Sequence, residues 1–141
     1  MIRQNGSLSG TLLSKLSVVF AALLLITSAL SLYGTFQRKE RNKNLESVTE
    51  SVSKSLRESC SLPGVVSLSR KIPHVEQPYV LVITGKWNRY QLVEISVDAG
   101  GNFSHSVILD RKVNSGNFKI ESNSPDKIKI RKADRVELEV I

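Results

Sequence analysis

The chain has 141 residues and a formal net charge of +7, with 23% charged and 6% aromatic residues. Its single cysteine, Cys60, excludes an internal disulfide and a zinc site built on cysteines. Residues 61–141 carry twelve basic and nine acidic residues, and this near balance argues against a nucleic-acid partner for the part of the chain that can fold.

The first 36 residues divide into a polar start and an apolar run. Residues 1–11 are short, polar and contain two glycines, which indicates a leader or a flexible tail. Residues 12–36 follow, with no charged residue after Lys15. A helix needs about 20 mostly apolar residues to cross a bilayer core, so this run is predicted to span a membrane. A signal sequence cut near Ala29 is the alternative, although the run is longer than the usual signal core.

Residues 37–61 are predicted to continue the same helix. They contain neither Gly nor Pro, and only Gly34 could interrupt the helix before them. One narrow apolar stripe, which we call the helix seam, has spacings of three, four and four residues: Leu45, Val48, Val52 and Leu56. Pro63 and Gly64 then end the helix.

From residue 62 to residue 141 the apolar period changes to two, which predicts short strands. The predicted strands are 66–72, 79–84, 90–98, 103–110, 118–121, 127–130 and 136–140. The strand at 79–84 is apolar on both faces and is predicted to be central, with a turn at Gly85–Arg89 after it. The expected fold class is α+β, in which a long N-terminal helix packs through its seam on a small antiparallel β-sheet or sandwich.

Few residues in this β domain indicate chemistry. His105 is predicted to pack on its strand and His74 to be solvated, and no carboxylate pair or phosphate loop is recognisable, so neither an enzyme nor a cofactor is expected. Lys127, Lys129 and Arg131 share one face of a strand. They predict either a charged edge strand or an anion-binding stripe. The stretch 86–90, KWNRY, could stack on a ligand or cover the sheet edge with its tryptophan.

The order of an apolar helix, a polar helix with one seam and a short antiparallel sheet resembles that of type IV pilins and pilin-like proteins. The resemblance is nearer to the archaeal pilin-like proteins. It lies in the helix LESVTESVSKSL, the Leu-Pro segment after it, a strand ending in Ile-Pro, and the run Pro-Tyr-Val-Leu-Val-Ile. It implies that the apolar half-helix first anchors the subunit in membrane lipid and then packs with other pilin-like subunits, or copies of itself, in a filament core. Assembly-platform proteins are further implied partners.

The resemblance also implies particular residues. Small side chains that would allow close helix packing are Ala21, Ala22, Ser28, Ala29 and Gly34. The candidate prepilin cleavage sites are Gly6 and Gly10. Cleavage after Gly10 places Lys15, and cleavage after Gly6 places Thr11, at the position where bacterial pilins carry a glutamate.

Three functions fit these patterns. The resemblance implies a cell-membrane protein with an extracytoplasmic β domain, acting as a structural or accessory subunit of a cell-surface filament or secretion-type assembly. The basic residues of segment 37–43 favour a cytoplasmic β domain by the positive-inside rule. The chain would then be a bitopic protein that binds an anionic lipid, a nucleic acid or a protein through a basic surface. Signal cleavage would instead release a secreted binding domain.

Overall fold

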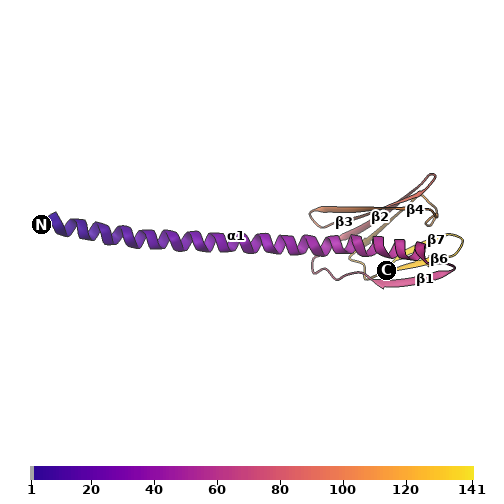
Figure 1. Ribbon diagram of the computed structural model, residues 1–141, viewed down its shortest axis with the longest axis horizontal. Coiled ribbons are helices and arrows are strands. Elements are labelled where there is room, and N and C mark those ends of the chain that lie inside the picture. Colours follow the sequence, from indigo (N-terminus) through magenta and orange to yellow (C-terminus); the bar gives the residue numbers. More distant parts are fainter. Residues whose placement is uncertain (1) are drawn as a thin grey trace. The chain divides into compact units, whose positions relative to one another are not determined.

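The computed structural model describes the backbone of residues 2–141 and the side chains of residues 8–141. One helix, α1 (Ile2–Ser61), precedes the strands β1 (Val66–Lys71), β2 (Val80–Trp87), β3 (Gln91–Asp98), β4 (Asn102–Leu109), β5 (Phe118–Asn123), β6 (Lys127–Lys132) and β7 (Val136–Val140) (Figure 1). The chain forms two compact units. The first, Met1–Glu40, contains the apolar half of α1, and the second, Arg41–Ile141, holds the rest of α1 and the strands.

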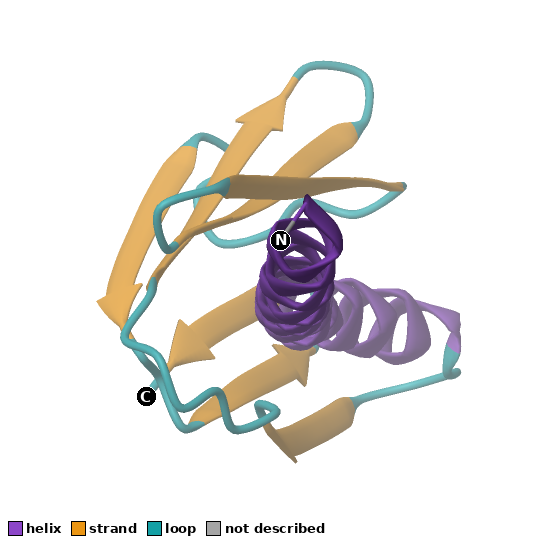
Figure 2. Cartoon of the chain, turned by 90° about the vertical axis from the view of Figure 1, so that its left-hand side faces the viewer, coloured by secondary structure: helices purple, strands orange, loops and turns teal. Residues whose placement is uncertain are grey.

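The strands of the second unit form two antiparallel sheets. The larger has the order β4-β3-β2-β5 and the smaller the order β1-β6-β7. The C-terminal part of α1 lies between them, with the larger sheet on one side and the smaller on the other (Figure 2). The predicted α+β class, with one long helix packed on small antiparallel sheets, is therefore confirmed. The predicted central strand is β2, which pairs with both β3 and β5.

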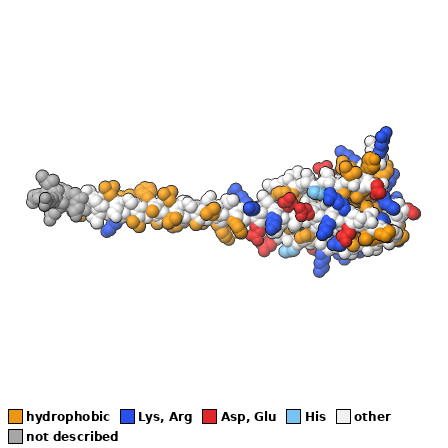
Figure 3. Space-filling view, in the orientation of Figure 1, with side chains coloured by type: hydrophobic (Ala, Val, Ile, Leu, Met, Phe, Trp, Pro, Cys, Tyr) orange, Lys and Arg blue, Asp and Glu red, His pale blue; other side chains and the backbone are white. Residues whose placement is uncertain are grey.

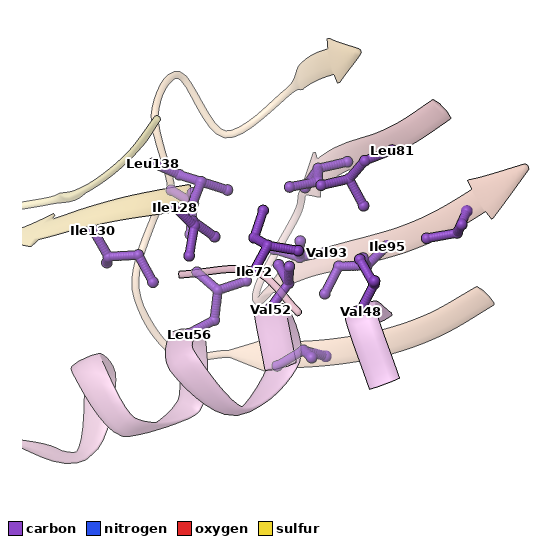
Figure 4. Packing of buried hydrophobic residues seen from close by; sticks show 14 of the residues in the cluster. Val48, Val52, Leu56, Ile72, Leu81, Val93, Ile95, Ile128, Ile130 and Leu138 are labelled. Atoms are coloured by element: carbon purple, nitrogen blue, oxygen red, sulfur yellow. The ribbon is translucent and has the colours of Figure 1, made fainter. Parts of the chain in front are cut away.

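The core of the second unit follows from the alternation of apolar and polar residues along each strand. In β3, for example, Val93, Ile95 and Val97 are buried and the residues between them face outward. The side chains of the larger sheet meet those of Ile128, Ile130 and other residues of the smaller sheet around the helix seam (Figure 4). Four short apolar side chains of α1 thus join both sheets into one core.

The predicted turn at Gly85–Arg89 is wrong at its start, because β2 continues through Gly85 to Trp87. Gly85 lies directly opposite Phe118 of β5. The aromatic ring of Phe118 covers Gly85 and occupies the space that a Cβ atom would need. Gly85 therefore lets the ring of Phe118 approach the backbone of β2 closely. In the sequence, a glycine with this role cannot be told from a glycine in a turn.

The helix begins before the predicted apolar run. It starts at Ile2, within residues 1–11, whose assignment as a leader or flexible tail stays a prediction. Once a helix has formed, each added residue contributes a hydrogen bond while only its own dihedral angles become fixed. A polar stretch without proline can therefore extend an existing helix backwards.

Candidate functional site

The apolar half of α1 is the most unusual surface of the described chain. Its large side chains are 53–72% exposed between Leu16 and Phe36, and they line this half of the helix in Figure 3. The helix is long and apolar enough to span a membrane, and the qualifying stretch lies near the N-terminus with none of it buried. An N-terminal signal sequence has the same properties.

Three hydroxyl groups in this half bond to the backbone of their own helix. The hydroxyls of Ser17, Thr27 and Thr35 donate to the carbonyl oxygens of Leu13, Leu23 and Ser31 at 2.8–2.9 Å. In hydrocarbon an unpaired polar group costs several kcal/mol. These internal hydrogen bonds remove that cost for the three hydroxyl groups, so these residues do not prevent the segment from entering an apolar environment.

Small residues gather on one face of this half-helix. Eight positions of this half follow one another at alternate spacings of four and three residues. Seven of them are small, namely Gly10, Ser14, Ser17, Ala21, Ser28, Ser31 and Thr35, and the exception is Leu24. This spacing keeps residues on one side of an α-helix, and we call that side the small-residue face. The opposite side carries large residues, namely Leu12, Val19, Leu23, Ile26 and Leu30.

The predicted helix-packing residues do not all lie on the small-residue face. Ala21 and Ser28 are one heptad apart on the small-residue face. Ala22 and Ala29 lie about 100° further around the helix, and Gly34 belongs to neither pair. The space around Gly10 and Gly34 is open, with nothing within 4 Å of an added Cβ. Both candidate cleavage sites, Gly6 and Gly10, lie within α1, and the surroundings of Gly6 fall outside the described side chains.

The helix seam is buried. Leu45 is 1% exposed, and Val48, Val52 and Leu56 are fully enclosed. Figure 4 shows Val48 and Val52 beside residues of β3, and Leu56 near Ile128 and Ile130 of β6. Burying a side chain of this size stabilises the fold by about 1.5–3 kcal/mol relative to exposing it. The seam therefore fixes the second half of α1 to both sheets.

Three basic side chains reinforce this attachment. Arg41 donates to the carbonyl oxygen of Ala99 in the β3–β4 hairpin at 2.7 Å. Arg70 of β1 contacts both carboxylate oxygens of Glu58 at 2.7–2.8 Å. Lys132 of β6 is buried and donates to the carbonyl oxygens of Leu62 and Cys60 at the end of the helix. The sequence pattern did not indicate this role, because the predicted strand ended at residue 130; β6 continues to Lys132, which lies on the same buried face as Ile128 and Ile130.

The candidate anion-binding stripe has a different place from the one predicted. The edge-strand interpretation is wrong, because β6 is the central strand of the smaller sheet, between β1 and β7. Lys129 and Arg131 are exposed, and Glu139 and Glu137 of β7 lie directly opposite them. Opposite charges across a strand pair attract, so these carboxylates offset the charges of Lys129 and Arg131, whereas Lys127 lies opposite Lys71 of β1.

The remaining candidates lie apart from one another. His105 is half-buried on β4, beside a groove of about 760 Å³ that also contacts Arg57 and Arg70. His74 is exposed at a cavity of about 470 Å³ whose lining includes the buried Tyr79. Among the side chains from residue 8 onward, no three His, Cys, Asp or Glu residues are placed to hold a metal ion.

Cys60 is half-buried near the end of α1. Burial raises the pKa of its thiol above the usual value, and the nearby carboxylate of Asp110 acts in the same direction. Only the thiolate is strongly nucleophilic, so this cysteine is less reactive than one in an unfolded chain.

Comparisons with known proteins identify no relative. No protein-family model matches the chain, and no curated protein or solved structure is significantly similar to it.

Proposed function

We propose that the chain is a single-pass membrane protein of type IV pilin-like architecture that acts by assembly. It would be a structural or accessory subunit of a cell-surface filament or of a secretion-type complex, with its β domain outside the cytoplasm. The observation that supports this most directly is the contrast within α1: the first half exposes its large apolar side chains, whereas the second half is fixed in a core.

The apolar half of α1 is costly to expose to water. Each Å² of exposed apolar surface costs about 25 cal/mol, so this half must lie in lipid or against other apolar helices. A helix can leave lipid only when another dry environment replaces it. Copies of the same helix can provide that environment, and small side chains allow two helix backbones to approach closely. Lipid and neighbouring subunits are thus the partners in this proposal, which requires no catalytic residue or cofactor.

The small-residue face gives the proposal a specific test. Two differently tagged copies of the full chain would be co-expressed and co-purified from detergent-solubilised membranes. The double substitution Ala21→Trp with Ser28→Trp should abolish co-purification, because the indole rings separate the helices. The matched control, Val19→Trp with Ile26→Trp, places the same rings one heptad apart on the opposite face and should leave co-purification unchanged. Equal recovery from both variants would argue against packing through this face.

The mature N-terminus tests the processing step. Mass spectrometry of the protein from membranes should give a chain that begins at Ser7 or Thr11 if a prepilin peptidase acts at Gly6 or Gly10. A chain that begins at Met1 would indicate a membrane anchor without processing. A start at Leu32 would indicate a secreted protein and would refute the membrane assignment.

A further inference from the structure

One end of the second unit gathers loops from distant parts of the sequence. The segment after α1, the β2–β3 turn, the β4–β5 loop and the β6–β7 turn all lie there (Figure 1). Arg111 donates to the carbonyl oxygen of Ala133 at 3.4 Å, and Val113 forms a bridge with Val136. We call this end the cationic end and define it as residues 61–65, 86–92, 108–117 and 131–137.

The charge of the two sheets is concentrated at the cationic end. Its exposed basic side chains are Lys86, Arg89, Arg111, Lys112, Arg131 and Arg135, and its exposed acidic ones are Asp110, Asp134 and Glu137. This gives +3, which equals the net charge of residues 61–141 as a whole. The buried Lys132 adds one more positive charge to this end, so the remaining residues of 61–141 carry a net charge of −1.

The same end carries exposed apolar side chains. Beyond residue 36 the exposed large hydrophobic residues are Leu62, Val65, Tyr90, Leu92, Ile108 and Ile141. All except Ile141 belong to the cationic end. Val65 is 76% exposed, and Ile108 is 70% exposed directly opposite Leu92 on the outer face of the larger sheet. Apolar and basic groups thus occur together at this end.

Side-chain amides hold the loops of this end in place. The side chain of Gln91 is fully buried; its amide nitrogen donates to the carbonyl oxygen of Gly116 at 2.8 Å, and its oxygen accepts from the backbone N–H of Val113 at 3.1 Å. The oxygen of Asn114 accepts from the backbone N–H of Leu138 at 2.9 Å. A surface ordered during folding loses little further entropy when it binds a partner.

This combination of residues identifies a class of partner. Basic side chains next to exposed aliphatic and aromatic side chains are typical of protein surfaces that enter the headgroup region of an anionic bilayer. A surface for single-stranded nucleic acid also combines basic and aromatic groups. A nucleic-acid surface does not explain the exposed Val65 and Ile108, however, because aliphatic side chains cannot stack on bases as aromatic rings do.

We propose that the cationic end docks on an anionic lipid bilayer. The lysines and arginines bind headgroup phosphates, and the exposed apolar side chains enter the boundary between headgroups and acyl chains. This surface is separate from the small-residue face, so it functions whether or not the helices assemble.

The test uses the full chain held by its own apolar helix in phosphatidylcholine nanodiscs. Co-flotation measures the partition of these discs onto vesicles of phosphatidylcholine with or without phosphatidylglycerol. We expect binding only to the vesicles that contain phosphatidylglycerol, and weaker binding at high salt. Each basic residue near an anionic surface contributes about 1 kcal/mol, or about a fivefold change. The substitutions Arg89→Ala and Arg135→Ala together should therefore lower the partition coefficient about 25-fold.

Two further variants make the test specific. The substitutions Tyr90→Ser and Ile108→Ser should weaken vesicle binding at every salt concentration, since they remove apolar contact and no charge. The control, Lys119→Ala with Lys129→Ala, removes two exposed charges outside the cationic end and should have a much smaller effect. The altered side chains are exposed, so the thermal unfolding of all these variants should match that of the unchanged chain.

Two results would overturn the proposal. An equal loss of binding in the two charge-removal variants would mean that net charge, and not this end, attracts the vesicles. Binding of a fluorescent single-stranded oligonucleotide by discs that ignore phosphatidylglycerol vesicles would identify the cationic end as a nucleic-acid surface.

Discussion

Lys132 provides the sharpest prediction about stability. It is 2% exposed, and its ammonium group donates to the carbonyl oxygens of Leu62 and Cys60, the latter at 3.5 Å. The last turn of α1 contains no basic residue of its own. Cations stabilise the negative end of a helix dipole and the unpaired carbonyls found there. A strand residue thus supplies the cation that the helix sequence lacks.

The substitution Lys132→Met keeps most of the buried aliphatic stem and removes the charge and its hydrogen bonds. A hydrogen bond that involves a charged group contributes about 1.5–3 kcal/mol. A cation at a partly buried helix C-terminus contributes up to about 2 kcal/mol, and the two values overlap because they describe the same ammonium group. We therefore expect the free energy of unfolding to fall by about 2–3 kcal/mol, which lowers the midpoint in urea by about 1 M.

The assay is urea unfolding of the full chain in detergent, followed by tryptophan fluorescence. Trp87 is the only tryptophan and lies in the second unit, so its signal reports on the β domain and not on the apolar half-helix. The control is Lys129→Met, which removes an exposed charge from the same strand and should change stability by no more than about 0.5 kcal/mol. If both variants unfold at the same urea concentration, Lys132 does not stabilise the end of α1.

Three other substitutions test the core. Gly85→Ala should destabilise the β domain by about 1–3 kcal/mol because its methyl group overlaps the ring of Phe118, and Phe118→Leu in the same chain should recover part of the loss in urea unfolding. Leu56→Ala should cost about 2–5 kcal/mol because Leu56 is fully buried, and an unchanged temperature of thermal unfolding would contradict its place in the core. Burial, and then the carboxylate of Asp126, raise the pKa of the Tyr79 hydroxyl in the folded chain. The contribution of the neutral hydroxyl to the free energy of unfolding is fully present below the pKa of an unfolded tyrosine, about 10. It is lost as the pH rises through the raised pKa of the folded chain. In urea titrations at alkaline pH, Tyr79→Phe should therefore lose less stability than the unchanged chain.

Local patterns in the sequence predicted the elements of this fold well. The spacing of Leu45, Val48, Val52 and Leu56 indicated one buried stripe on a helix, and alternating residues gave every strand to within a few positions. Such patterns depend only on the period of the backbone, which is 3.6 residues in a helix and two in a strand. They fail where the residue type is set by a contact with a residue far away in the sequence, as Gly85 is by the ring of Phe118.

The sequence by itself determined an exposed apolar half-helix, a second half with one seam, and a β domain of short antiparallel strands. Only the tertiary structure decided which strands are neighbours and which distant residues are in contact. Strand order placed Lys129 and Arg131 at the centre of the smaller sheet opposite two glutamates, and it brought Lys132 to the end of α1. It also assembled the cationic end from four separate segments. Strand order and loop contacts join residues far apart in the chain, and no local period records which distant segments will meet.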